Sequence, residues 1–292
     1  MNFPQKNLLS KIKTIKTIWG VNLNFLDKTN LKSQMTEIKN SFDGIEIATG
    51  FFDTKHKDDF LKICKDLNLS IVTQIHTNGY HIKSNDIKVH LDDFKSKLED
   101  SLTWDPVLIN SHSGTDYWDK QKNLEFFEKS QEISKNILND KVEVCHETHR
   151  QRILFNPFSS YQVLKSVPNL SITLDLSHWI VTSERLLNEE SDYYWNNLES
   201  NLIMNTGMIH ARIGTINNIQ VVDPEYFKEY EKYYFGIWKK IIENSKKNVI
   251  YIDYEYGPEP YLFNNPETGR PFKELPQIIN EQKKKFDHYL SI

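Results

Sequence analysis

The sequence contains few cysteines and no long apolar segment. Cys64 and Cys145 are the only cysteines among 292 residues, too few for a disulfide framework, which predicts a reducing compartment. No run approaches the roughly 18 apolar residues of a membrane span, and the opening stretch MNFPQKNLLSKIK lacks the apolar core of a signal peptide. We therefore expect a cytoplasmic protein with no membrane partner.

The chain also lacks an excess of basic residues, a glycine-rich nucleotide loop and an interdomain linker. It has 36 Lys and Arg residues and 40 Asp and Glu residues, which gives a formal charge of −4. We therefore expect no nucleic-acid partner. No G-x-G-x-x-G follows an early strand candidate, which argues against a dinucleotide crevice. No Pro-, Gly- or Ser-rich segment divides the chain, so we expect one domain over residues 1–292.

What the sequence does contain is an alternation of short apolar runs and longer amphipathic stretches. The runs are rich in Val and Ile, as strands buried on both faces should be, and they lie at 17–23, 44–50, 69–76, 107–114, 142–148, 171–179, 207–214 and 249–257. Helical patterns lie at 58–67, 89–102, 123–139 and 225–244.

This alternation of eight strands with helices predicts an α/β fold, a single (β/α)8 TIM barrel. A loop followed by a closing helix is expected over about 258–292, where LPQIINEQKKKFDHYL has a helical pattern. A doubly wound sheet is the competing interpretation, because alternation alone does not establish that the sheet closes.

Titratable side chains accumulate at the C-terminal ends of the predicted strands. They are His76, His112, Glu147, His149, Asp175, His178, His210, Arg212, Asp253 and Glu255. In a barrel these ends converge on one face, where the active site lies in characterised examples. Carboxylates gathered there would repel one another without a cation. The pattern therefore predicts one divalent metal ion, with Mn²⁺, Mg²⁺, Co²⁺ and Zn²⁺ as the candidates.

Five motifs lie at these strand ends: INSHSGTDYW (109–118), HETHRQR (146–152), LDLSHW (174–179), HARIG (210–214) and EYGPEPY (255–261). In this order they resemble the xylose isomerase-like barrels. More narrowly, they resemble the bacterial sugar phosphate isomerase/epimerase group, which includes ketose 3-epimerases and inosose dehydratase. The resemblance implies a metal quartet of Glu147, Asp175, His210 and Glu255, and it implies that the two glutamates are the catalytic acid and base.

The resemblance also implies that His178 and Arg212 bind the substrate. Two roles are open for His76, His112 and His149: each could contact the substrate, or each could make an ordinary hydrogen bond at the barrel mouth. Glu46 could touch the ligand or brace the metal site, and an aromatic wall against a sugar could include Trp19, Trp118 and Trp179.

Structural roles compete with these assignments. Asp175 could cap a helix, and Glu147 could pair with a neighbouring arginine at a surface turn. His210, taken alone, is more often a core histidine than a ligand. Asp253 competes with Glu255 because both lie on the same face of one strand. Glu255 is preferred as the ligand because it lies nearer the end of that strand.

The implied activity is isomerisation or epimerisation of a sugar, sugar acid or sugar phosphate. A metal-polarised carbonyl would acidify the neighbouring C–H, and one glutamate would remove that proton to give an enediolate. A dehydratase or lyase acting on a keto-sugar or inosose would share this first step. The expected partner is a small carbohydrate, and a homodimer is a further expectation.

Two other classes of function remain as alternatives. The barrel also resembles endonuclease IV, a zinc phosphodiesterase, but the Asp-x-His pair of that enzyme has no counterpart in INNIQVVDPEYF (216–227), which offers Asp223 and no histidine. A sugar-binding barrel without catalysis would require a decayed metal quartet, and all four positions are intact.

Overall fold

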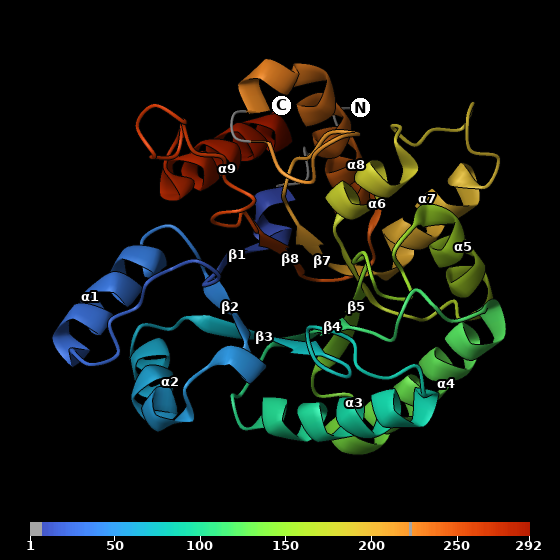
Figure 1. Ribbon diagram of the computed structural model, residues 1–292, viewed down its shortest axis with the longest axis horizontal. Helices are drawn as coiled ribbons and strands as arrows, with labels where there is room; N and C mark the ends of the chain where they lie inside the picture. Colours follow the sequence, from blue (N-terminus) through green and yellow to red (C-terminus); the bar gives the residue numbers. More distant parts are fainter. Residues whose placement is uncertain (1–7, 222–223) are drawn as a thin grey trace, which may run out of the picture.

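The structure is a computed structural model that describes residues 8–221 and 224–292. Its centre is a closed barrel of parallel strands in sequence order, ringed by helices (Figure 1). The strands are β1 (Ile12–Thr17), β2 (Gly44–Ala48), β3 (Ser70–His76), β4 (Leu108–His112), β5 (Glu143–Glu147), β6 (Ile172–Leu174), β7 (Thr206–His210) and β8 (Ile250–Asp253). Because β8 pairs with β1, the sheet has no open edge, and the predicted TIM barrel is confirmed over a doubly wound sheet.

The helices follow the strands and cover the outside of the barrel. They are α1 (Lys28–Lys39), α2 (Lys57–Asp66), α3 (Ile87–Leu102), α4 (Lys120–Leu138), α5 (Pro157–Ser166), α6 (Leu176–Ser183), α7 (Trp195–Asn205), α8 (Lys228–Asn244) and α9 (Leu275–Ser291). Local sequence fixes where several of them begin. Asp86 and Asp119 accept hydrogen bonds from backbone N–H groups at the starts of α3 and α4, which satisfies donors that a helix start leaves free.

Two predicted strands are corrected by the structure. The first strand is Ile12–Thr17, not 17–23, and residues 18–23 belong to the loop after it. The lysines of IKTIKT interrupt the apolar pattern of this strand. Gly20, with a φ of +75°, turns the chain away from an extended path. The sixth strand ends at Leu174, because Asp175 begins α6 instead of continuing the sheet.

The interior of the barrel is layered along the strand direction. Ile15, Val72, Leu108, Cys145 and Met208 form an apolar cluster contributed by five different strands. Side chains of a strand alternate between its two faces, so the next inward-facing positions lie two residues further along each strand. There the side chains become polar, and this layer holds the candidate site.

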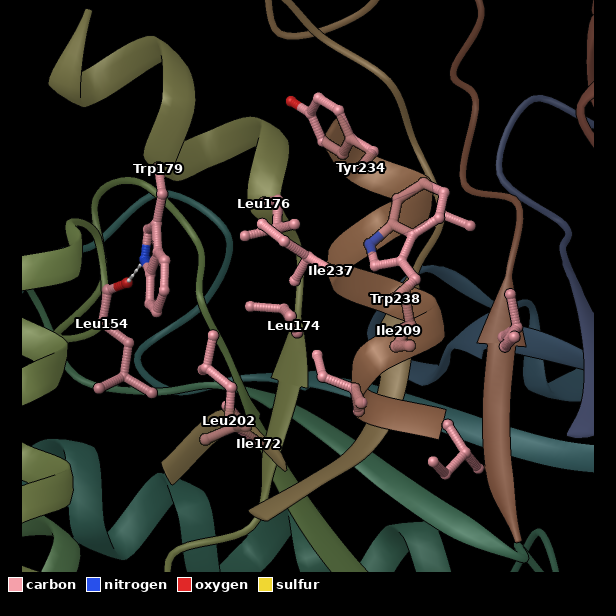
Figure 2. Close-up of a cluster of buried hydrophobic side chains, with 14 of the residues drawn as sticks. Leu154, Ile172, Leu174, Leu176, Trp179, Leu202, Ile209, Tyr234, Ile237 and Trp238 are labelled. Atoms are coloured by element: carbon pink, nitrogen blue, oxygen red, sulfur yellow. Dashed lines mark hydrogen bonds between the residues drawn. The ribbon is translucent and has the colours of Figure 1, made fainter. Parts of the chain in front are cut away.

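The larger core lies between the barrel and its helices. Leu174 on β6 and Ile209 on β7 face Ile237 and Trp238 of α8, all buried (Figure 2). Each such side chain contributes about 1.5–3 kcal/mol when fully buried. Trp179 lies in this core too, where its Nε1–H donates to the Leu154 carbonyl at 2.9 Å. It therefore does not belong to the predicted aromatic wall. Within the described residues, no helix is long and apolar enough to cross a membrane.

Candidate metal centre

Four buried side chains from four consecutive β–α units meet at the C-terminal end of the barrel. Glu147 is the last residue of β5, Asp175 follows β6, His210 is the last residue of β7, and Glu255 lies two residues beyond β8. Each offers one ligand atom, and these atoms lie within 4.8 Å of one another. The structure thus brings together the quartet that the sequence predicts as metal ligands.

His210 lies at the centre of this group. Its Nδ1 is 3.3 Å from Glu255 Oε2 and 3.6 Å from Glu147 Oε1. Its Nε2 is 3.3 Å from Glu46 Oε2. Burial alone would lower the pKa of His210, but attraction from Glu255, Glu46 and Glu147 outweighs it and raises the pKa well above the usual value. In the metal-free protein, His210 is thus the cation that balances these carboxylates.

Glu46 lies behind the quartet and not among it. Its carboxylate faces His210 Nε2, the imidazole nitrogen on the side away from Glu147 and Glu255. A carboxylate that accepts from the second nitrogen of a histidine orients the first nitrogen toward a metal. Of the two roles that the sequence left open for Glu46, this geometry favours bracing the metal site.

Asn110 on β4 is a site residue that the sequence analysis missed. Its Nδ2 donates to Glu147 Oε2 at 2.8 Å and to Glu46 Oε1 at 3.0 Å, so one amide holds two carboxylates apart. The available signal was its position, because Asn110 faces inward two residues before His112 on the same strand.

The two glutamates of the quartet are ionised in this environment. Burial would raise the pKa of Glu147, but His112 and His210 together lower it well below the usual value. Burial likewise opposes the shift of Glu255, whose pKa is lowered by His210 and Arg212. Both carboxylates are therefore available as ligands or bases at neutral pH.

Asp175 has the capping role that the sequence offered, and it also lies beside the other predicted metal ligands. Its Oδ1 caps α6, accepting from the Ser177 backbone N–H at 2.8 Å and from the Ser177 hydroxyl at 2.6 Å. Its Oδ2 pairs with Arg212. Burial raises the pKa of Asp175, and the charge of Arg212 opposes that rise. One oxygen thus fixes the backbone while the other faces the quartet.

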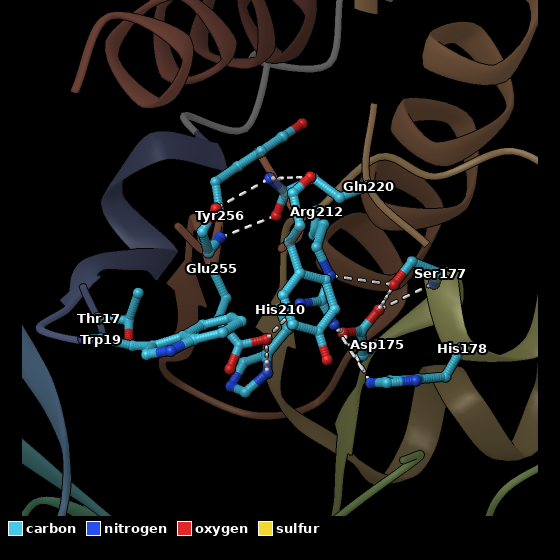
Figure 3. A network of polar contacts seen from close by, with 12 residues as sticks. Thr17, Trp19, Asp175, Ser177, His178, His210, Arg212, Gln220, Glu255 and Tyr256 are labelled. Atoms are coloured by element: carbon cyan, nitrogen blue, oxygen red, sulfur yellow. Dashed lines mark hydrogen bonds and ion pairs between the residues drawn. The ribbon is translucent and has the colours of Figure 1, made fainter. Parts of the chain in front are cut away.

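Arg212 is buried against the quartet. Its guanidinium pairs with Asp175 and lies 3.3 Å from Glu255 Oε2, and its Nη2 lies 3.2 Å from His178 Nε2 (Figure 3). It also lines the cavity above the quartet. Substrate contact by Arg212 stays a prediction, and the observed role is to hold two of the predicted ligands.

An arc of four imidazoles borders the quartet. Ring centroids are 4.3 Å apart for His76 and His112, 4.3 Å for His112 and His149, and 4.1 Å for His149 and His178. Burial is the largest cause that lowers the pKa of His76, His149 and His178 well below the usual value. These three rings are therefore neutral at pH 7, and each can hydrogen-bond a hydroxyl group.

The arc opens into a cavity of about 570 Å³ at the barrel mouth. All four arc histidines line it, together with Glu46, Arg212 and Glu255. Trp19 of the proposed aromatic wall lines it as well, whereas Trp118 is buried beside Phe126 in the outer core. The predicted substrate-binding residues thus share one cavity with Glu255, the member of the quartet that lines it.

Two further predicted residues lie elsewhere. Asp253 accepts from the Thr17 backbone N–H at 2.8 Å and groups with Glu46 and His210 instead of joining the quartet. Asp223, considered for the nuclease alternative, lies outside the described residues.

The quartet fits a divalent cation. Three carboxylates and one imidazole are ligands that Mn²⁺, Mg²⁺, Co²⁺ and Zn²⁺ accept. Glu147 Oε1 and His210 Nδ1 are buried and have no hydrogen-bond partner within the described part of the chain. Buried polar atoms are rarely left unsatisfied, so a bound cation would explain both.

Comparisons with known proteins identify the fold. No family model matches the chain, and no curated protein matches it. Among solved structures, D-allulose 3-epimerase from Methylomonas sp. aligns over 99% of both chains with a TM-score of 0.61 and 12% identity. A probable 3-DHS dehydratase from Bacillus anthracis aligns over 93% of this chain and 97% of its own, with a TM-score of 0.57 and 16% identity.

A third solved structure has a similar fold. It is a xylose isomerase-like TIM barrel protein from Mycobacterium smegmatis in complex with magnesium, which aligns over 91% of this chain and 89% of its own. Its TM-score is 0.59 at 12% identity. At these identities the likeness concerns the fold alone, and the chain has the fold of the xylose isomerase-like TIM barrels.

Proposed function

We propose that the protein is a divalent-metal-dependent isomerase or epimerase of a small sugar that reacts through an enediolate. The observation that carries this proposal is the buried quartet of Glu147, Asp175, His210 and Glu255 below a histidine-lined cavity. The epimerase and the dehydratase with the same fold support it. The quartet would hold the cation, which supplies Lewis-acid polarisation of a substrate carbonyl when bound.

Glu147 and Glu255 are the proposed bases. Glu147 Oε1 and Glu255 Oε2 both lie near His210 Nδ1, at 3.6 and 3.3 Å, and both pKa values are lowered. One carboxylate removes the proton from the carbon next to the carbonyl and keeps it. The other carboxylate, after it has taken up a proton from solvent, gives that proton to the resulting enediolate. Return to the opposite face inverts that carbon. Steps of this kind contribute about 10²–10⁴-fold each.

The remaining side chains bind and orient the substrate. Neutral His76, His149 and His178 can each donate or accept a hydrogen bond with a sugar hydroxyl. Arg212 provides a fixed positive charge at the quartet, which stabilises the negative charge of an enediolate without rearrangement during the reaction. Asn110 keeps Glu147 in place.

The test is solvent-proton exchange. The purified protein, loaded with Mn²⁺, Mg²⁺, Co²⁺ or Zn²⁺ in turn, is incubated in D₂O with a panel of ketoses, keto-glycosides and inososes. Deuterium next to the carbonyl, followed by NMR, is expected for at least one substrate. It should disappear in Glu147→Gln and Glu255→Gln. Full exchange in both variants would refute the two-glutamate mechanism.

The same spectra separate the closely related reactions. Isomerisation or epimerisation keeps the composition of the sugar, whereas a dehydratase or lyase loses a β-substituent from the same enediolate. Loss of water or of an alcohol would therefore replace the proposed reaction by elimination. Absence of exchange from every substrate with every metal would remove the proton-transfer proposal.

A further inference from the structure

The cavity extends well beyond the quartet. Its volume of about 570 Å³ lies within the range of roughly 300–1,000 Å³ that accommodates drug-sized ligands. A free pentose or hexose is smaller than such ligands. If the reacting carbons lie at the quartet, part of the cavity remains for another portion of the substrate.

The extra space has apolar walls. They come from the loop after β1 and from the segment after β2, and the residues are Ile18, Val21, Leu23, Phe25 and Phe52. Among the described residues no lysine lines the cavity, and Arg212 is the one arginine that does. Because Arg212 is already paired with Asp175 and Glu255, the cavity offers no free cation for a phosphate group.

Trp19 is held in place at the cavity mouth. A Cβ on Gly257 would lie only 2.1 Å from its ring, so the indole packs directly on the Gly257 backbone. Gln220 fixes that backbone, accepting from the Gly257 N–H at 2.8 Å and donating to its carbonyl at 3.0 Å. Tyr261 packs edge-on against Trp19 at 5.1 Å. Figure 3 shows Trp19 beside Glu255.

Trp19 is also unlike the other tryptophans. All six lie in the described part of the chain; Trp19 is 37% exposed, and the other five are 6% exposed or less. Phe51, which lines the same cavity, is 70% exposed and packs edge-on against His76 at 5.9 Å and Tyr80 at 6.1 Å. Two fixed but uncovered aromatic rings therefore flank the entrance to a polar centre. Grouped apolar exposure of this kind marks a binding surface.

We infer that the substrate is an unphosphorylated keto-sugar with an apolar, ring-sized substituent, such as a keto-glycoside with an aromatic aglycone. The sugar lies at the histidine arc and the quartet, and the substituent packs against Trp19, Phe51 and the apolar wall. This inference rests on the proposed function for the placement of the sugar. It adds a substrate class that the quartet by itself does not specify.

Binding of matched ligands tests the inference. Calorimetry on the metal-loaded protein compares methyl with phenyl β-D-glucopyranoside, methyl with phenyl β-D-galactopyranoside, and D-glucose 6-phosphate. Burial of a phenyl ring should tighten binding by about 10-fold or more in at least one pair. Equal binding within both pairs, no binding of either phenyl glycoside, or tightest binding of the phosphate would each overturn it.

Two further measurements locate the phenyl ring. Because Trp19 is the exposed tryptophan, a bound phenyl glycoside should protect the emission from quenching by acrylamide, and the methyl glycoside should protect less. Phe51→Ala should reduce the preference for phenyl over methyl, and Gly257→Ala should do the same by displacing the indole. Phe272→Ala is the control, because Phe272 is 62% exposed and lies outside the cavity lining. The assignment would be contradicted if Phe272→Ala lost as much of the preference for phenyl over methyl as the two test variants, or if the test variants lost none of it.

These measurements stand apart from the exchange test. A preference for phenyl glycosides without any deuterium exchange would support the subsite and refute the proposed reaction. Exchange on a free or phosphorylated sugar without such a preference would support the reaction and refute the subsite.

Discussion

Two groups of buried histidines differ in how their ring nitrogens are satisfied. His90 on α3 lies outside the barrel, with Nδ1 3.0 Å from Thr77 Oγ1 and Nε2 2.9 Å from the Ser84 carbonyl. His146 on β5 lies between Phe94 and Phe127, with Nδ1 2.6 Å from Ser113 Oγ. These contacts give both rings structural roles in the packing between barrel and helices.

Three histidines of the barrel mouth have ring nitrogens that lack such partners. In the described part of the chain, Nδ1 is buried without a hydrogen bond in His112, His178 and His210. All three rings lie beside carboxylates. Burial is common to both groups of histidines. The difference is that the barrel-mouth histidines have ring nitrogens without hydrogen bonds, and these nitrogens converge on one point. That convergence indicates a ligand site.

The largest expected difference between the two groups is in metal binding. His210→Ala removes the imidazole at the centre of the quartet, so stoichiometric metal should be lost. His146→Gln keeps an acceptor for Ser113 and should retain the metal. Elemental analysis after dialysis measures both, and unchanged metal content in His210→Ala would exclude His210 as a ligand.

The next effect is on stability at low pH. Burial lowers the pKa of His146 from 6.5 to about 3, so the unfolded state takes up the proton first as the pH falls below 6.5. The contribution of neutral His146 to the free energy of unfolding is therefore fully present above pH 6.5 and is lost as the pH falls toward 3. At pH 4 the loss is about 3 kcal/mol.

His146→Gln removes this titration. Urea unfolding of the metal-free proteins at pH 7 and pH 4 should show a smaller loss of stability in the variant than in the parent protein. The other titrating groups are common to both and cancel in the difference. An identical loss in both proteins would show that His146 is not held neutral by burial.

A smaller change is expected from Glu46, which acts on the metal through His210. Glu46→Gln removes the carboxylate 3.3 Å from His210 Nε2, and loss of such a partner lowers metal affinity by about 10–100-fold. Competition with a chelator of known affinity measures the change. Asp43→Asn, at a partly exposed carboxylate that pairs with Lys13, is a matched control that should leave the affinity unchanged.

The smallest effect is expected at His90. In His90→Leu the Thr77 hydroxyl keeps its bonds with the His112 carbonyl and the Gly114 N–H, so mainly the Ser84 carbonyl loses its partner. The expected cost is about 1 kcal/mol of unfolding free energy, measured by urea unfolding, with metal content unchanged. A loss of metal would show that the two groups of histidines are not independent.

Much of the fold could be predicted from local patterns, and the failures have local causes. Seven of the eight predicted runs overlap the strands substantially, because Val and Ile concentrate where a strand is buried on both faces. β1 was misplaced because Lys13 and Lys16 interrupt its apolar pattern. The role of Asn110 could not be predicted, because an amide between two carboxylates has no signature in a single strand.

Local residue patterns account for the alternation of strands and helices and for the change from apolar to titratable residues along each strand. Neighbouring residues His146 and Glu147 show the local rule, since one faces the helices and the other faces the barrel interior. Which of the titratable groups meet depends on how the strands are arranged in space. Closure of the barrel brings residues more than a hundred positions apart, such as Glu147 and Glu255, to the same nitrogen of one imidazole. Distances between separate strands depend on that closure and are not encoded in any local pattern.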